Sequence, residues 1–248
     1  MTPDRECSRE AMMQQYRHVR RSLRVGMAAA CLVVVLVPPA QAQGRRARKS
    51  SPPPASTLPE GWVARLDPQE EKRGRTLAEV TLEGDSLALH VAGGPAVTLW
   101  NNAYHAEGRF MVWGSFTQTR ATTPPGGYGP FIGGTSLDGK EYNYLYCAVH
   151  GNGAYSIKHR FGGELHTLVE RRVSGAIRPA DASGKASNAI GWLVDETNVA
   201  CVINGTSVST FPRTLLLGPG KLESIDGIFG LHVDRDVDVR ITEFGVKH

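Results

Sequence analysis

Hydrophobic and polar residues alternate along most of the chain after residue 85, and Gly, Asn, Asp and Pro interrupt the alternation. A period of two is typical of β-strands with one face on a core, and turn residues separate one strand from the next. Helical periodicity is nearly absent. The pattern predicts ten strands: Ser86 to Val91, Ala96 to Trp100, Arg109 to Gln118, Tyr142 to Val149, Ala154 to Phe161, Leu165 to Arg171, Ala189 to Val194, Val199 to Asn204, Ile228 to Val233 and Val237 to Val246.

The turns between these strands indicate antiparallel pairing. Asn204-Gly205 separates two apolar runs, which is the strongest short hairpin signal, and Asp138-Gly139 has the same form. The glycines of Gly126 to Pro130 and Gly133-Gly134 fit no phosphate-binding loop and are interpreted as flexible strand connections. Ten strands are more than one flat sheet holds, so we expect an all-β sandwich of two antiparallel sheets.

The N-terminal region differs from the rest. Met27 to Val37 is an uninterrupted run of eleven apolar residues, preceded by clustered arginines and followed by Ala40-Gln41-Ala42. These are the three parts of a secretory signal, so residues 1–42 are predicted to be a signal peptide that is cleaved after Ala42. Arg20-Arg21 leaves the twin-arginine route open as well as the general one. We expect a secreted or periplasmic protein with no stable membrane span, because the run is shorter than the roughly twenty residues that cross a bilayer.

Residues 43–60 are rich in Arg, Ser and Pro, without apolar periodicity, which is typical of a disordered linker. A single domain over residues 61–248 is long enough to bury a substantial core.

The net charge of the chain is distributed unevenly between the N-terminal region and the predicted domain. Residues 1–50 hold ten of the 28 basic side chains and three of the 24 acidic ones, which leaves 18 basic and 21 acidic in the rest. The folded domain therefore lacks the basic surface of a nucleic-acid-binding protein, and no nucleic-acid partner is expected.

The cysteines are also distributed between these two regions. Cys7 and Cys31 lie in the signal peptide, so only Cys147 and Cys201 reach an oxidising compartment. A disulfide between them is one interpretation, and two free thiols that act as small core residues is the other.

The order of the strands is similar to that in a known superfamily. Three segments show the resemblance: Val199-Ala-Cys-Val-Ile-Asn-Gly, Gly227-Ile-Phe-Gly-Leu-His-Val and Val237-Asp-Val-Arg-Ile-Thr-Glu-Phe-Gly-Val. Together they resemble the concanavalin A-like lectin/glucanase superfamily and, more narrowly, secreted jelly-roll domains related to 3-keto-disaccharide hydrolases. The resemblance covers about residues 110–246 and implies a saccharide ligand. Its motifs mark turns and core positions, so they indicate the fold rather than an activity.

The candidate ligand site is aromatic. Tyr142, Tyr144 and Tyr146 alternate on one strand and so share a face, where rings could stack on a sugar or pack in a core. Tyr155, Lys158 and His159 follow in the next strand of the predicted hairpin, and the sheet order that the resemblance implies would add Trp113, Tyr128 and His150 to the same patch. The favoured function is an exported carbohydrate-binding domain that recognises a saccharide on an aromatic concave face.

Two other functions stay open. The E-x-D-x-x-E signature of laminarinases is absent, so no catalytic residue is assigned. A glycosidase or lyase of the 3-keto-disaccharide type would place Glu107, Glu141 or Glu164 near His150 or His159. The third hypothesis is a structural or protein-binding module of the cell envelope.

No cofactor is expected. Asp234, Asp236 and Asp238 offer carboxylates at alternate positions, which leaves structural calcium as an alternative. The eight histidines form no zinc motif.

Overall fold

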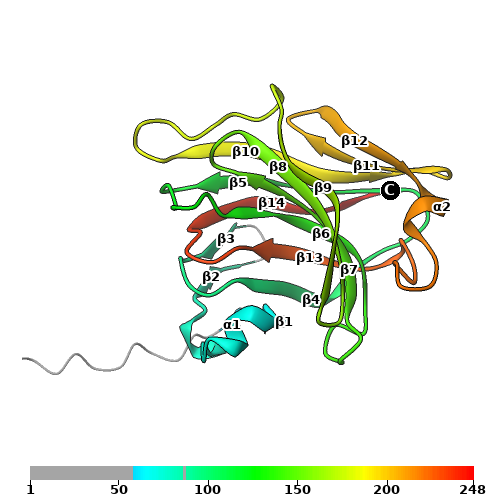
Figure 1. Cartoon of the computed structure of the whole chain (residues 1–248), viewed down its shortest axis with the longest axis horizontal. Helices are drawn as coiled ribbons and strands as arrows, with labels where there is room; N and C mark the ends of the chain where they lie inside the picture. The colour runs from blue at the N-terminus through cyan, green and yellow to red at the C-terminus, as the bar shows by residue number, and fades with distance from the viewer. Residues whose placement is uncertain (1–57, 86–87) are drawn as a thin grey trace, which may run out of the picture. The chain divides into compact units, whose positions relative to one another are not determined.

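The computed structural model describes residues 58–85 and 88–248, so the predicted signal peptide and nearly all of the linker lie outside the described residues. The described part is a sandwich of two antiparallel seven-stranded sheets (Figure 1), which confirms the predicted all-β jelly-roll fold. Sheet A has the order β1-β4-β13-β6-β7-β8-β9, and sheet B the order β12-β11-β10-β5-β14-β3-β2.

The strands of sheet A are β1 (Trp62–Leu66), β4 (Val97–Ala106), β6 (Gly127–Thr135), β7 (Asn143–His150), β8 (Ala154–Phe161), β9 (Glu164–Val173) and β13 (Gly227–Val233). Those of sheet B are β2 (Leu82–Gly84), β3 (Ala88–Val91), β5 (Phe110–Gln118), β10 (Ala186–Val194), β11 (Asn198–Ile203), β12 (Thr206–Pro212) and β14 (Val239–Lys247). Short helices are α1 (Pro68–Lys72), η1 (Leu77–Glu79) and α2 (Arg213–Leu216). No helix in the described ranges is long and apolar enough to cross a membrane.

The main core lies between the sheets, and alternation along each strand decides what enters it. Leu145, Cys147 and Val149 of β7 belong to this core, whereas Tyr144 and Tyr146 pack in a separate cluster. We call the side of sheet A that carries this second cluster, turned away from sheet B, its outer face.

A disulfide joins the two sheets. Cys147 of β7 and Cys201 of β11 are both fully buried and form a disulfide bond across the core. The indole N–H of Trp192 on β10 also donates to the carbonyl of Pro130 on β6, at 3.0 Å. Both links fix how sheet A sits on sheet B.

The interpretation of Gly126 to Pro130 and Gly133-Gly134 as flexible connections was wrong. Most of this segment forms β6, a central strand of sheet A between β13 and β7. At Gly129 a Cβ atom would overlap the carbonyl oxygen of Cys147 on β7, so the close approach of the two strands requires glycine there. The glycines that suggested a loop allow this packing.

The predicted hairpin at Asn204-Gly205 is present between β11 and β12. Both residues have positive φ, at 49° and 81°, as a two-residue type I′ turn requires.

Candidate functional site

The tyrosines at the start of β7, Tyr142 just before it and Tyr144 and Tyr146 on it, lie on the outer face of sheet A, but they are largely covered. Tyr142, Tyr144 and Tyr146 are only 4, 2 and 4% exposed, and they pack with Trp100 and Phe131. The structure therefore has a packed aromatic layer where an open aromatic surface was expected.

One end of this layer is closed by the chain itself. The guanidinium of Arg65 on β1 lies 3.8 Å from the centre of the Tyr142 ring. The same group donates to the carbonyl oxygens of Leu137 and Gly139 in the β6–β7 turn, each at 2.7 Å. The hydroxyl of Tyr144 is hydrogen-bonded to Thr98 at 2.8 Å.

The other end opens into a polar pocket of about 470 Å³, which we call the outer-face pocket. Side chains from β7, β8, β9, β13 and α1 line it, together with segment 122–126 and the β13–β14 turn. Its charged lining consists of Asp67, Glu70, Arg73, Arg75, Lys158, Arg160, Arg171, Asp234, Arg235 and Asp236, and Tyr146, His232 and Leu165 complete the wall.

His232 and Tyr146 form the centre of this wall. Their rings lie 4.0 Å apart, centre to centre. The Nε2–H of His232 donates to Asp234 at 3.2 Å, while its buried Nδ1 has no hydrogen-bond partner among the described residues. Burial alone would raise the pKa of Asp234, but hydrogen bonds from His232 and from the backbone N–H of Gly127 lower it to about 2. This carboxylate is ionised at neutral pH.

A buried ion pair forms the opposite side of the pocket. Arg160 of β8 pairs with Asp67, whose other oxygen accepts from the N–H of Gln69 at 2.9 Å and so caps α1. Burial acts to lower the pKa of the Arg160 guanidinium, but the charges of Tyr144 and Asp67 raise it overall. The Nε–H of Arg160 is buried and has no hydrogen-bond partner among the described residues.

The predicted site residues do not all share one face. Lys158 lies in the outer-face pocket with Tyr146, but its neighbours on β8, Tyr155 and His159, point to the opposite side of the sheet. Tyr155 is buried between the sheets and donates to the carbonyl of Val208 at 2.8 Å. Successive side chains on a strand point to opposite faces, so the prediction that Lys158 and His159 share one patch was wrong.

Three further predicted residues also lie elsewhere. Tyr128 is fully buried in the core between the sheets, where burial raises its pKa to about 12. Trp113 is on sheet B, with the ammonium of Lys247 5.0 Å from its ring centre. His150 ends β7 and bonds to Ser156 at 3.0 Å, outside the pocket wall. Only Tyr146 and Lys158 of the predicted set line the outer-face pocket.

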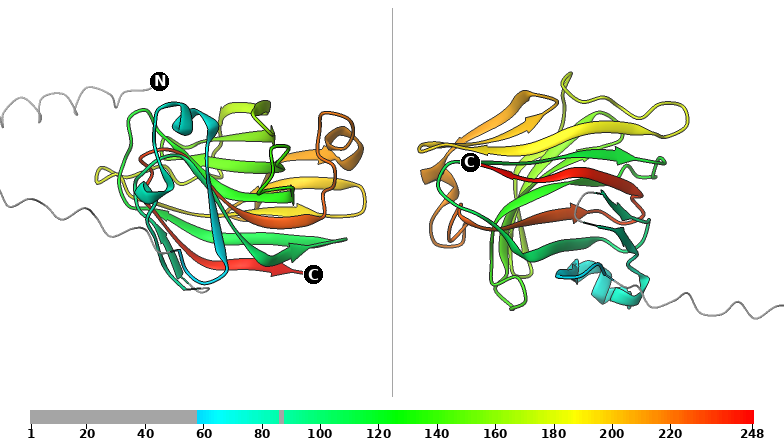
Figure 2. Two further views of the ribbon diagram at one scale, coloured as in Figure 1. Left: turned by 90° about the horizontal axis from the view of Figure 1, so that it is seen from below. Right: turned by 180° about the vertical axis from the view of Figure 1, so that it is seen from behind.

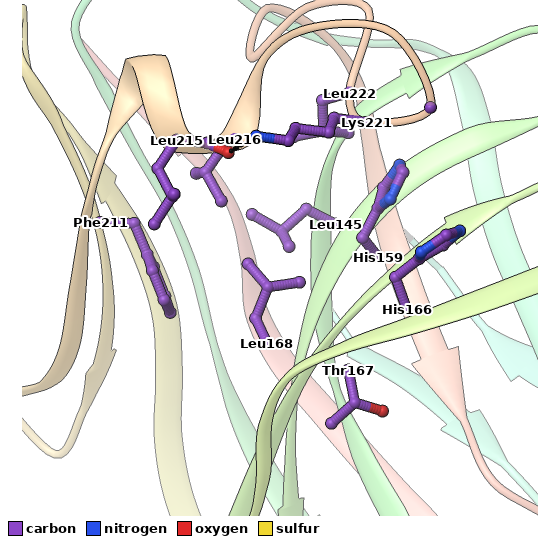
Figure 3. A pocket seen from close by; sticks show the side chains of 11 residues that line it. Leu145, His159, His166, Thr167, Leu168, Phe211, Leu215, Leu216, Lys221 and Leu222 are labelled. Atoms are coloured by element: carbon purple, nitrogen blue, oxygen red, sulfur yellow. Dashed lines mark hydrogen bonds between the residues drawn. The ribbon is translucent and has the colours of Figure 1, made fainter.

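A second, apolar cavity of about 340 Å³ lies beside α2 (Figure 3). Leucines and Phe211 form most of its lining, and the rings of His159 and His166 stand on one side of it. His159 donates from Nε2 to Asn143 at 2.7 Å, and burial, followed by the charge of His166, lowers its pKa to about 4. His159 therefore lines this cavity and not the outer-face pocket.

The carboxylates that a glycosidase hypothesis would use are not in the outer-face pocket. Glu107, Glu141 and Glu164 are all exposed, and Glu164 pairs with His166 on β9 rather than with His159. Among the described residues, no group of three or more His, Cys, Asp or Glu side chains could hold a metal ion.

Most residues of the outer-face pocket were not predicted from the sequence. Asp67, Glu70 and Arg73 come from the short α1 region, which has no strand pattern, and Arg160, Arg171 and His232 were not singled out. The signal that could have found Arg160 was its spacing: it lies two residues after Lys158 on a strand and must share its face.

No protein-family model matches this sequence, and neither does any curated protein. Among solved structures, the chain is similar to the carbohydrate-binding module CBM66 from Bacillus subtilis, with 12% identity over 76% of this chain and 96% of that chain and a TM-score of 0.52. It is also similar to a Bacillus subtilis protein of unknown function with a galectin-like fold, with 14% identity over 75% of this chain and 88% of that chain and a TM-score of 0.52.

These similarities concern the fold. At such identities they show a similar fold alone and do not transfer a superfamily or a ligand. The narrower resemblance to 3-keto-disaccharide hydrolases is not confirmed.

Proposed function

We propose that this chain is an exported saccharide-binding domain and that it holds the saccharide in the outer-face pocket. The observation that carries the proposal is the pocket itself, about 470 Å³ of space lined by hydrogen-bonding and charged side chains around the Tyr146–His232 ring pair. This volume lies within the roughly 300–1,000 Å³ of small-molecule sites. The similar fold of a module whose name describes carbohydrate binding supports the same function.

The chemistry of the pocket suits hydroxyl groups. A sugar hydroxyl both donates and accepts, so it can donate to carboxylates of the pocket lining such as Asp236 and accept from lining ammonium or guanidinium groups such as those of Lys158 and Arg171. Recognition would depend on hydrogen bonds more than on ring stacking, since the face of Tyr146 is already covered by His232.

The covered tyrosines suggest a structural role for the other end of the layer. Tyr142 and Tyr144 are sealed by Arg65, the β6–β7 turn and Thr98, which is how a purely structural module would look. That role applies to the closed end, whereas the open pocket is the part available to a ligand.

The test is binding of the full chain to a glycan array and to polysaccharide affinity gels. The variants His232→Ala and Tyr146→Ala should weaken binding about tenfold or more, since each removes part of the pocket wall. Trp113→Ala on sheet B is the matched control and should bind like the wild type. Thermal melting identifies variants that fail to fold, and Tyr146→Phe, which keeps the ring, serves as the milder second variant.

Unchanged binding by folded His232→Ala and Tyr146→Ala proteins, or loss of binding in Trp113→Ala alone, would place the ligand elsewhere and contradict the proposal.

A further inference from the structure

The outer-face pocket carries more positive than negative side chains. Six lining residues are Lys or Arg and four are Asp or Glu. The chain from residue 51 onward has the opposite balance, with 18 basic and 21 acidic residues. The positive excess is therefore a property of this pocket and not of the domain as a whole.

The carboxylates in the pocket are already engaged. Asp67 pairs with Arg160 and caps α1, and Asp234 accepts from His232 and from a backbone N–H. Glu70, whose side chain is only 3% exposed, lies 2.5 Å from Arg73 and 3.7 Å from Arg235. Asp236 lies 3.9 Å from the guanidinium of Arg235, so all four negative charges face cations or donors within the protein.

Two of the cations, in contrast, have no carboxylate partner. The ammonium group of Lys158 on β8 makes no hydrogen bond or ion pair with any described residue. The guanidinium of Arg171 on the neighbouring strand β9 donates only to the backbone carbonyl of Pro125, at 2.8 Å, which leaves its charge without a counterion in the described structure. Arg160 is the third cation that these two strands contribute to the pocket lining, and its terminal nitrogen is paired with Asp67.

These cations line one wall. Lys158 and Arg160 lie two residues apart on β8 and so point to the same face, and β9 is hydrogen-bonded to β8. An anionic group on a ligand at this wall would meet the unneutralised positive charge of Lys158 and Arg171 together. Charge-assisted hydrogen bonds of this kind are about twice as strong as neutral ones.

We propose that the saccharide taken by the outer-face pocket is acidic, with a carboxylate or sulfate group bound at the wall formed by Lys158, Arg160 and Arg171. This inference rests on the proposed saccharide-binding function and names the class of its ligand. The hydroxyls of the sugar then use the His232 side of the pocket, and the anionic group uses the β8–β9 side.

The experiment compares matched pairs of oligosaccharides by titration calorimetry with the full chain. One pair is oligogalacturonate and its full methyl ester, which tests carboxylate, and the other is a sulfated galactan oligosaccharide and its desulfated form, which tests sulfate. At least one acidic member should bind about tenfold more tightly than its neutral partner, and this preference should shrink between about 0.05 M and about 0.5 M salt, because salt screens the charges.

Variants connect the preference to the wall. Lys158→Gln should weaken binding of the acidic member about fivefold and change binding of the neutral member less than twofold, whereas Lys185→Gln, at an exposed turn, should change neither. Lys158 has no partner in the described structure, so its removal leaves no unpaired group.

The outcomes separate the two proposals. Equal, salt-insensitive binding of acidic and neutral members overturns the acidic ligand and leaves saccharide binding standing. Absence of binding to any array glycan overturns both. Equally tight binding of inorganic phosphate or single-stranded DNA overturns the acidic saccharide in favour of a general anion site.

Discussion

Two histidines are held uncharged by burial, although they lie in different parts of sheet A. The pKa of His150 falls from 6.5 to about 4, first through burial and then through the charge of Arg171. The pKa of His159 falls to about 4, first through burial and then through His166. Between about pH 4 and pH 6.5 the unfolded chain binds protons at both positions and the folded chain does not, so the free energy of unfolding rises with pH in this window.

The stability that these histidines contribute is therefore fully present above about pH 6.5 and is lost as the pH falls toward 4. We expect the free energy of unfolding to drop by roughly 2–3 kcal/mol per histidine over this range, as urea denaturation at several pH values would measure. His159→Gln should reduce this pH dependence, while His105→Gln, at an exposed position of β4, should preserve it. An unchanged slope in His159→Gln would show that the site does not stay neutral in the folded protein.

At the level of single residues, the sequence predicted little of the site. Alternation was enough to place the three tyrosines on one face, but it does not tell which face is covered. Tyr142 is buried under Arg65, which also donates to the β6–β7 turn. Tyr144 is buried against Phe131, with its hydroxyl hydrogen-bonded to Thr98. Alternation on one strand does not predict contacts with such distant parts of the chain. Tyr128 was predicted on the ligand face, but its position in the alternation of β6 directs its side chain into the core.

Among the elements, strands with clear alternation were predicted and the glycine-rich strand was not. Nine predicted strands overlap β4, β5, β7, β8, β9, β10, β11, β13 and β14, and the tenth overlaps β3 across the gap in the described residues. The ten do not include β1, β2, β6 and β12. Of these, β6 lies at the centre of sheet A, and it was missed because glycine disfavours a strand by propensity but is required where two backbones approach closely.

This explanation of β6 can be tested by one added methyl group. Gly129→Ala would push a Cβ into the carbonyl oxygen of Cys147, so the strands must separate, and we expect a loss of about 3 kcal/mol of unfolding free energy. Gly175→Ala is the matched control, because nothing lies within 4 Å of its added Cβ. Chemical denaturation of both variants provides the comparison. A Gly129→Ala protein as stable as Gly175→Ala would mean that propensity, not close packing, governs this strand.

At the scale of the whole molecule, the charge and the cysteine content of the domain become clear only when the N-terminal region is considered separately from it. The basic balance of the full sequence belongs to residues 1–50, and only after their removal does the positive pocket stand out against an otherwise acidic domain. The same division leaves Cys147 and Cys201 as the cysteines of the domain, and the structure joins them. Sequence could not decide their pairing, because proximity across two sheets depends on how the sheets pack.

The disulfide and the predicted signal peptide both favour a location outside the cytoplasm. A structural disulfide persists in oxidising compartments, and the sequence separation of 54 residues between the cysteines corresponds to about 4 kcal/mol of stabilisation by the loop-closure argument. We therefore expect the protein recovered outside the cytoplasm to begin at Gln43 and to contain the Cys147–Cys201 bond. Mass spectrometry of the intact protein and its non-reduced peptides measures both.

Two variants separate export from bond formation. Ala42→Arg removes the small residue before the predicted cleavage point and should leave the signal peptide attached, while the domain itself is unaltered. The double change Cys147→Ser with Cys201→Ser should leave cleavage intact and lower the free energy of unfolding by about 4 kcal/mol, because the closed loop is lost from the unfolded state. Free thiols in wild-type protein isolated from outside the cytoplasm would contradict the bond. A mature terminus far from residue 43 would contradict the cleavage site without affecting the fold or the pocket.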